Sequence, residues 1–144
     1  MDEEEVFMSY NCNLIAVIDE SGKEALFCLR KKPPYQGRLN FVGGKIEPGE
    51  DGLSAAYREL GEETGIPEDA IDLMHLMNLE YMLEEGRMEV YAGRLKRHVD
   101  VVDEVNRLCW LPLEQDYADC ARFAGVGNVG HIIYYIREWT DLLK

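Results

Sequence analysis

The segment from Asp51 to Thr64 constrains the fold of this chain more than any other, because it combines an apolar stripe with crowded acids. Its apolar residues recur at helical spacing, at Leu53, Ala56, Tyr57 and Leu60. The Gly65 and Pro67 that follow are typical of the end of a helix, so we predict a helix of about four turns. A helix with one apolar face packs that face into a core and leaves the other for solvent or a cleft.

The same helix carries three crowded carboxylates. Glu59, Glu62 and Glu63 stand at i, i+3 and i+4, which places them on one face. Like charges this close repel one another, and the helix macrodipole disfavours acids toward the C-terminal end. We therefore expect a compensating cation, and oxygen ligands favour hard ions such as Mg2+ or Mn2+. A solvated acidic face is the alternative, and the usual explanation for such a pattern in isolation.

The loop that enters this helix is rich in glycine. Gly43, Gly44 and Gly49 allow its backbone to approach a ligand closely, with carbonyls available to a metal and amides to phosphate oxygens.

The rest of the chain predicts strands and one further helix. Short apolar runs bounded by turn residues predict strands over 13–19, 25–29, 39–42, 73–83, 88–95 and 107–111. A terminal amphipathic helix over 128–143 follows from a stripe at Val129, Ile132, Ile133, Ile136, Trp139 and Leu143. With 144 residues, the chain fits a single domain, 1–144.

The charge of the chain limits its partners. Lys and Arg number 15 against 28 Asp and Glu, for a formal net charge of -13. A field of this sign repels a long nucleic acid, whereas it suits a protein that concentrates divalent cations for a small anionic ligand. No apolar stretch is long enough to cross a bilayer, and the first residues lack a signal-peptide pattern, so we expect no membrane partner.

The cysteines argue for a reduced compartment. Cys12, Cys28, Cys109 and Cys120 form no C-x-x-C pair, which disfavours zinc. We expect a cytoplasmic protein whose thiols are small buried hydrophobes.

A longer motif surrounds the three glutamates. Read from Gly44, the sequence runs glycine, five residues, Glu50, seven residues, Arg58-Glu59-Leu60, one residue, Glu62-Glu63, one residue, Gly65-Ile66. It matches every fixed position of the signature G-x5-E-x7-R-E-U-x-E-E-x-G-U, where U is aliphatic, over residues 44–66. So many positions at set spacing are far more specific than a short glycine motif. The chain therefore resembles the Nudix hydrolase family, and within it the MutT-like nucleoside triphosphatases.

The resemblance implies both a fold and a set of roles. The fold is the Nudix fold, of class α/β (α+β), with a mixed β-sheet sandwiched between α-helices. Glu59, Glu62 and Glu63 resemble metal ligands, joined by the backbone carbonyl of Gly44 or its neighbour. Arg58 and Glu50 resemble the supporting ion pair that orients the catalytic acids.

The implied reaction is hydrolysis of a nucleoside diphosphate linked to a further group, with Mg2+ as cofactor and Mn2+ as an alternative. A metal-activated water attacks phosphorus, and a carboxylate removes its proton. Family members differ in which acid does this. The stretch from Asp103 to Trp110 resembles D-E-x-x-x-x-x-W of MutT-like enzymes, which makes Glu104 a candidate metal ligand or base. An exposed loop acid is the alternative.

The stretch from Gly37 to Lys45 resembles the G-R-W-N-G-F-G-G-K segment of oxidised purine nucleoside triphosphatases. By that resemblance Asn40 contacts the base, Lys45 lies near phosphates, and Arg38 belongs to the substrate site. The chain departs from the pattern at Leu39, which replaces tryptophan, and it lacks the W-P-D-D stretch that reads the oxidised purine.

Three alternatives stay open. The first expectation is a small nucleotide substrate, a nucleoside triphosphate, oxidised or not, cleaved to the monophosphate and pyrophosphate. The second is ADP-ribose or another NDP-X compound, and the third is a nucleotide-sensing module without catalysis, although all box glutamates are present. The apolar and aromatic residues of the last helix could also serve a homodimer contact.

Overall fold

The computed structural model describes residues 11–32, 35–80, 86–103, 105–125 and 127–144. Its strands are β1 (Cys12–Ile18), β2 (Glu24–Leu29), β3 (Leu39–Asn40), β4 (Met74–Glu80), β5 (Arg87–Arg94) and β6 (Leu108–Pro112). The helices are α2 (Gly52–Thr64), the short 3-10 helix η1 (Glu68–Ala70) and α3 (Asn128–Trp139).

The strands form one mixed sheet in the order β3-β2-β1-β5-β4, with β6 paired to β2. β1 pairs in parallel with β5, from Cys12 opposite Met88 to Ile18 opposite Arg94. Its other neighbour, β2, is antiparallel, as are the pairs β4 with β5 and β6 with β2. Every residue of β1 is buried, because this strand lies inside the sheet and is covered on both faces.

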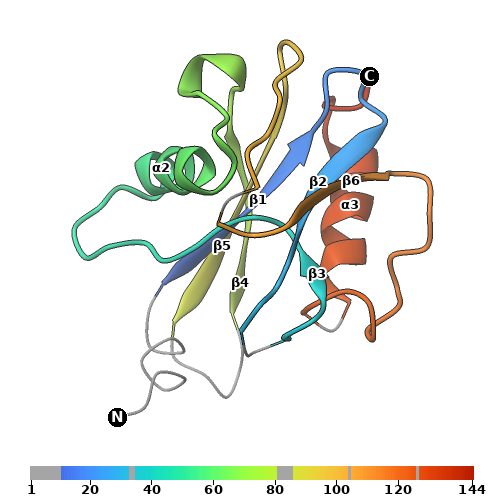
Figure 1. Ribbon diagram of the computed structural model, residues 1–144, viewed down its shortest axis with the longest axis horizontal. Helices are drawn as coiled ribbons and strands as arrows, with labels where there is room; N and C mark the ends of the chain where they lie inside the picture. Colours follow the sequence, from blue (N-terminus) through green and yellow to red (C-terminus); the bar gives the residue numbers. More distant parts are fainter. Residues whose placement is uncertain (1–10, 33–34, 81–85, 104, 126) are drawn as a thin grey trace.

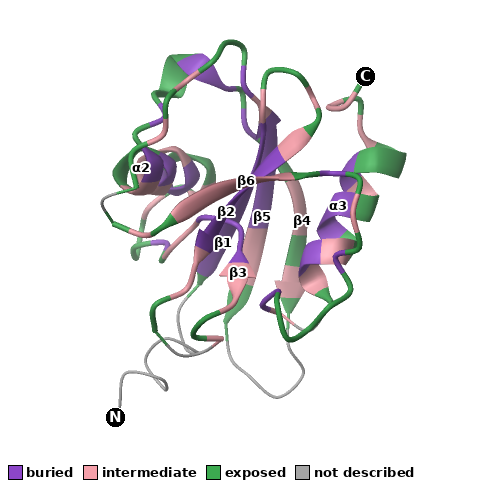
Figure 2. Cartoon of the chain, turned by 45° about the vertical axis from the view of Figure 1, so that its right-hand side comes forward, coloured by how far each residue is buried: buried purple, intermediate pink, exposed green. Residues whose placement is uncertain are grey.

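The two long helices lie on opposite faces of the sheet (Figure 1). Alternate residues of β1 point to opposite faces, and the two apolar clusters divide accordingly. Ile15 and Val17 share a cluster with Leu60 of α2, whereas Leu14 and Ala16 share the other with Ile132 of α3. Figure 2 shows the purple inner surfaces of both helices turned to the sheet. The predicted class, a mixed sheet between helices, is confirmed.

Helix α2 begins and ends where the sequence indicated. The Asp51 side chain caps the first turn by accepting from the Ser54 N–H, and Gly65 ends the helix in the left-handed conformation, at φ 76°. The bounds of the helix set the directions in which the side chains of Glu59, Glu62 and Glu63 project from it.

The burial pattern corrects two residues of the predicted stripes. Leu53 is 40% exposed, because the buried residues of α2 begin only at Ala55 and Ala56. Trp139 is 72% exposed, because α3 ends there. Thr140 Oγ1 donates to the Ile136 carbonyl and accepts from the Leu142 N–H, which turns the chain out of the helix earlier than predicted.

The expectation of four buried thiols was only half correct. Cys12 and Cys28 are buried, Cys109 is half-buried and Cys120 is exposed, and all four are free thiols. Burial raises the pKa of Cys28 to about 12, so this thiol is unreactive at neutral pH. In the described part of the chain, no helix is both long and apolar enough to span a bilayer.

Candidate active site

The glycine loop before α2 is hydrogen-bonded to the N-terminal end of β1. Asn13 N–H donates to the Gly44 carbonyl at 2.8 Å, and the Gly44 N–H donates to Asn13 Oδ1 at 2.9 Å. A Cβ on Gly43 would overlap with the main-chain oxygen of Asn13, so only glycine allows this approach. The loop thus presents Gly43 and Gly44 to the C-terminal half of α2.

Two of the three glutamates face this loop. Glu63 Oε2 accepts from the Gly43 N–H at 3.3 Å. The carboxyl group of Glu59 lies against Gly44, since a Cβ there would come within 2.5 Å of its carboxyl carbon. Glu62 lies farther out, with 59% of its side chain exposed.

Arg58 connects the acids. Its Nε and Nη2 atoms form a two-point ion pair with Glu50 at 2.8 and 2.9 Å, which is the pair expected from the motif. Nη2 also donates to the Lys45 carbonyl at 3.1 Å, and Nη1 contacts Glu59 at 3.0 Å and Glu62 at 3.3 Å. The rigid guanidinium fork therefore spaces the acids and fixes them to the loop.

Burial changes the proton affinity of the two inner acids. Loss of solvation raises the pKa of Glu63 to about 7, with a smaller contribution from the neighbouring Glu59. Burial also raises the pKa of Glu59, against the opposing effect of Arg58. By contrast, the hydrogen bonds from Arg58 lower the pKa of Glu50 to about 2. Burial disfavours the charged form of both carboxylates, and a bound cation would stabilise that form.

The residues present fit a hard divalent ion in their chemistry. Carboxylate oxygens from Glu59, Glu62 and Glu63 and the carbonyl of Gly44 are the donors that Mg2+ and Mn2+ prefer. Because Gly44 has no side chain, the Glu59 carboxyl group can lie beside its carbonyl. Among the described residues, no three His, Cys, Asp or Glu side chains are yet grouped as a metal site. Glu59 and Glu62 pair with Arg58 through carboxylate oxygens that keep further lone pairs, so both can hold this contact and also bind an ion.

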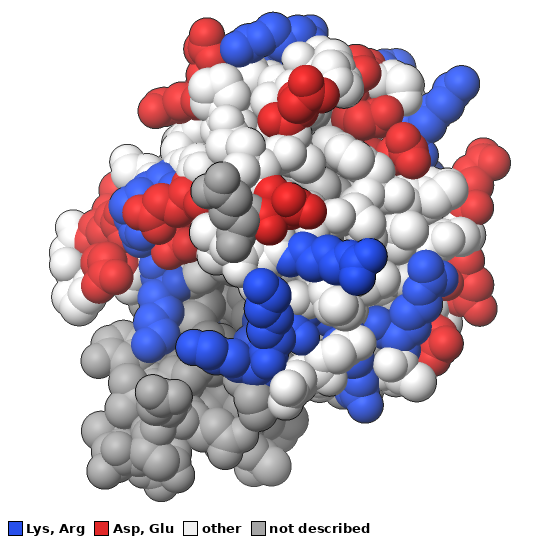
Figure 3. All heavy atoms as spheres, viewed as in Figure 1, with Lys and Arg blue, Asp and Glu red and all other residues white. Residues whose placement is uncertain are grey.

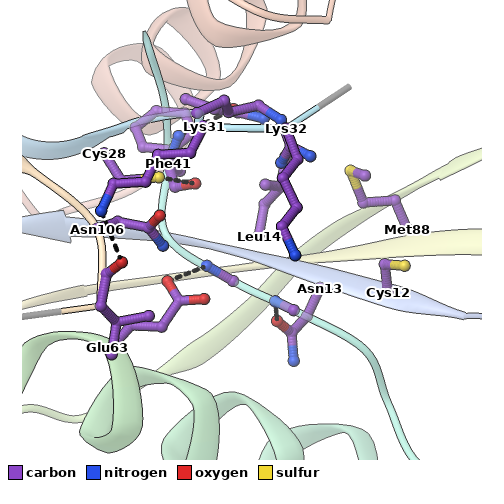
Figure 4. Close-up of a pocket in the computed structure, with 15 residues that line it drawn as sticks. Cys12, Asn13, Leu14, Cys28, Lys31, Lys32, Phe41, Glu63, Met88 and Asn106 are labelled. Atoms are coloured by element: carbon purple, nitrogen blue, oxygen red, sulfur yellow. Dashed lines mark hydrogen bonds between the residues drawn. The ribbon is translucent and has the colours of Figure 1, made fainter. Parts of the chain in front are cut away.

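A cavity of about 370 Å³ lies beside these acids (Figure 4). One wall holds Glu63, Gly43 and Gly44, and another holds the basic residues Arg30, Lys31 and Lys32. Lys31 Nζ is held at this wall by the Val105 carbonyl, at 3.2 Å. The other lining residues are polar or apolar: Asn13, Asn40, Asn106, Cys12, Leu14, Cys28, Phe41, Met88 and Val105. This size suits a small molecule that carries both charge and an apolar group.

The substrate residues predicted from the sequence do not all line this cavity. Asn40 does, and it is 9% exposed, with Oδ1 accepting from the Phe41 N–H at 2.9 Å. Arg38 and Lys45 are not among the lining residues; the Arg38 guanidinium lies 5.7 Å from the Tyr35 ring centre. Glu104 lies outside the residues that the structure describes.

Sequence reasoning missed other residues of the site. Arg30, Lys31 and Lys32 were not predicted to belong to the site, and Asn13 was predicted only as the first residue of a strand. The sequence signal that could have indicated the three basic residues is their position as a run in a strongly acidic chain. Figure 3 shows Lys and Arg side chains gathered in the lower half of this face, beside the acids near α2.

The chain also resembles known proteins. Residues 11–119 match the model of the NUDIX domain family. The chain is 30% identical over 89 residues to an oxidized purine nucleoside triphosphate hydrolase of Danio rerio, a match covering 62% of this chain and 56% of that protein. It is 40% identical over 60 residues to an octanoyltransferase of Myxococcus xanthus, covering 41% of this chain and 17% of that one. Both relatives are thus matched over less than two thirds of their length.

Solved structures share the fold. An Ap4A hydrolase of C. elegans, in a binary complex, superposes with a TM-score of 0.70 at 23% identity, covering 88% of this chain and 96% of that one. The family model covers most of the chain, and the complete glutamate motif and the shared fold agree with it, so the chain belongs to the Nudix family.

Proposed function

We propose that the protein is a Mg2+-dependent pyrophosphohydrolase that cleaves a nucleoside triphosphate to the monophosphate and pyrophosphate. The observation that supports this most is the shape of one cavity, in which an acidic wall with Glu63 faces a basic wall with Arg30, Lys31 and Lys32. A polyphosphate chain with its metal ion has the charges to lie between such walls. The 30% identity to a nucleoside triphosphate hydrolase supports the same substrate class.

Each wall has a separate task in this proposal. The basic side chains would bind phosphate oxygens that the overall charge of -13 otherwise repels. Asn40 is buried in the same cavity and can offer an amide donor and acceptor to a base edge. Lys45 and Arg38, proposed from the sequence, lie outside the lining and would serve the part of a substrate that extends beyond it.

Glu59, Glu62, Glu63 and the Gly44 carbonyl would hold the metal, together with Glu104 by the sequence motif. A bound divalent ion supplies an activated water and neutralises charge on the phosphoryl oxygens. Arg58 would keep Glu59 and Glu62 oriented, as its contacts of 3.0 and 3.3 Å indicate. Glu63 and Glu104 are the two candidates to remove the proton of the attacking water.

The test is turnover of a nucleotide panel with and without Mg2+. We expect Glu63→Gln to lower kcat by about a hundredfold or more, because the amide cannot take a proton and binds a cation less well. Glu68→Gln, an exposed acid of η1 outside the site, is the matched control and should leave kcat unchanged. Equal turnover in wild type and Glu63→Gln would overturn the proposed site.

The panel also separates the substrate classes. Canonical and oxidised triphosphates, ADP-ribose, nucleotide sugars and dinucleoside polyphosphates would be ranked by kcat/KM. A preference for ADP-ribose would favour the NDP-X alternative, and binding without turnover would favour a sensor. The cytoplasmic location and the homodimer remain predictions; Tyr134 and Trp139, 56% and 72% exposed, are the residues a dimer contact would cover.

A further inference from the structure

Asn13 is a polar residue in a place where the chain is otherwise apolar. It directly precedes the apolar run from Leu14 to Ile18 in β1, a strand whose residues are all buried, and Asn13 itself is only 2% exposed. Alternation along β1 puts its side chain on the same face as Ile15 and Val17, the face that α2 covers. Figure 4 shows Asn13 beside the loop that bears Gly43 and Gly44.

Asn13 bonds to both polar groups of Gly44. Its main-chain N–H donates to the Gly44 carbonyl at 2.8 Å, and its Oδ1 accepts from the Gly44 N–H at 2.9 Å. With the amide reversed, two donors would face each other, so the hydrogen bond fixes the orientation of the side chain. A bond to the Gly44 carbonyl leaves its second lone pair for another partner.

The same orientation leaves one group without a partner. Asn13 Nδ2 is buried and makes no hydrogen bond to any described residue. Buried polar groups are nearly always satisfied, and an exception next to a binding site calls for an explanation. Asn13 lines the cavity that also holds Glu63.

We propose that Asn13 is a positioning residue with two tasks, an inference that rests on the proposed function. Its main chain and Oδ1 fix the Gly44 peptide, so that the carbonyl stays beside Glu59. Its buried Nδ2 group donates to an oxygen that arrives with the metal and nucleotide, either a phosphate oxygen or a bound water. The residue thereby links the geometry of the metal site to occupation by substrate.

Two variants separate the two tasks. Asn13→Ala removes both side-chain groups, whereas Asn13→Asp keeps an acceptor for the Gly44 N–H and removes the donor. Asn11→Ala is the control: Asn11 is exposed, accepts from the Arg87 N–H, and is not among the lining residues. Hydrogen exchange of the Gly44 amide, Mn2+ affinity by electron paramagnetic resonance, and kcat and KM for a nucleoside triphosphate would be measured for each, with circular dichroism to verify folding.

We expect the Gly44 amide to exchange slowly in the wild type and in Asn13→Asp, and faster in Asn13→Ala. The affinity for Mn2+ should fall by about ten- to a hundredfold in Asn13→Ala, the usual effect of losing a residue that orients a metal ligand. In Asn13→Asp the affinity for Mn2+ should be retained while KM rises, because the donor to the arriving oxygen is lost. Asn11→Ala should match the wild type in all of these measurements.

The outcomes are distinct from those of the proposed function. A wild type that binds Mn2+ but hydrolyses no nucleotide would contradict the proposed function. The measurements of Mn2+ affinity and amide exchange would still test whether Asn13 positions the Gly44 peptide. Folded Asn13→Ala protein with unchanged Mn2+ affinity and kcat would overturn the inference. If Asn13→Ala fails to fold, fast exchange of the wild-type Gly44 amide, or an unchanged KM in Asn13→Asp, would overturn it in the same way.

Discussion

Arg58 is the residue on which most of the site's internal order depends. One guanidinium contacts Glu50 at two points, a loop carbonyl, Glu59 and Glu62. A flexible ammonium could not make these bonds together, because they require the fixed fork of donors. The motif predicted the pair with Glu50, since its spacing specifies it. The contact with Glu62 joins residues four apart on the helix, a spacing that brings side chains together. The contact with Glu59 joins consecutive residues and depends on how both side chains bend, which spacing does not specify.

The Glu50–Arg58 pair should make stability depend on pH in a defined window. Because hydrogen bonds from Arg58 lower the pKa of Glu50 from 4.5 to about 2, the folded state prefers the charged form. The pair's contribution is present above the ordinary value of 4.5 and is lost as pH falls through the folded value of about 2. In urea unfolding, Glu50→Gln should be less stable than wild type at neutral pH, and the difference should shrink below pH 4.5.

The exposed Glu114 provides the control for this pH dependence. A Glu114→Gln variant should follow the wild type throughout the acid range. A gap between wild type and Glu50→Gln that stayed constant from neutral pH down to the folded pKa would contradict the assigned shift.

At the scale of elements, helix α2 both holds the acids and packs the core. Leu53 and Leu60 are two turns apart and share an angular position, yet Leu60 is 1% exposed and Leu53 is 40% exposed. Truncation of Leu60 to alanine should lower the free energy of unfolding by about 2–5 kcal/mol, because it leaves a cavity under the helix. Leu53→Ala should change it by at most about 0.5–1 kcal/mol. Chemical denaturation of both variants checks this, and equal losses would show that the first turn is packed after all.

The difference between these leucines shows what the sequence could and could not predict. Strands and helices were located to within a few residues, because apolar alternation, caps and the Nudix motif are local signals. Leu53 was misplaced because periodicity gives the direction of a side chain but not where the covering sheet ends. Asn13 and the wall of Lys31 and Lys32 were missed for a related reason, since partners such as Gly44 are 31 residues away in the chain and only the fold brings them together.

At the scale of the whole molecule, function requires an anion to approach a chain with a formal charge of -13. Two electrostatic effects oppose each other: the diffuse repulsion by surface acids and the local attraction by Arg30, Lys31 and Lys32 at the cavity. The Debye length is about 10 Å at an ionic strength of about 0.1 M, so salt already screens much of the repulsion from distant acids. Contacts within the cavity are screened less, and the local attraction should therefore dominate under ordinary conditions.

This balance predicts how salt acts on catalysis. As NaCl is raised from about 0.05 M to about 0.3 M at saturating Mg2+, KM for a nucleoside triphosphate should rise several-fold, since the remaining attraction weakens. In a Lys31→Ala/Lys32→Ala variant, KM should start higher and depend less on salt, because the side chains responsible are gone. Lys96→Ala, which removes an exposed lysine paired with Asp72 at 2.9 Å, should keep the wild-type slope. If KM instead fell with added salt, the diffuse acidity would be the stronger effect, and the basic wall would not be what attracts the substrate.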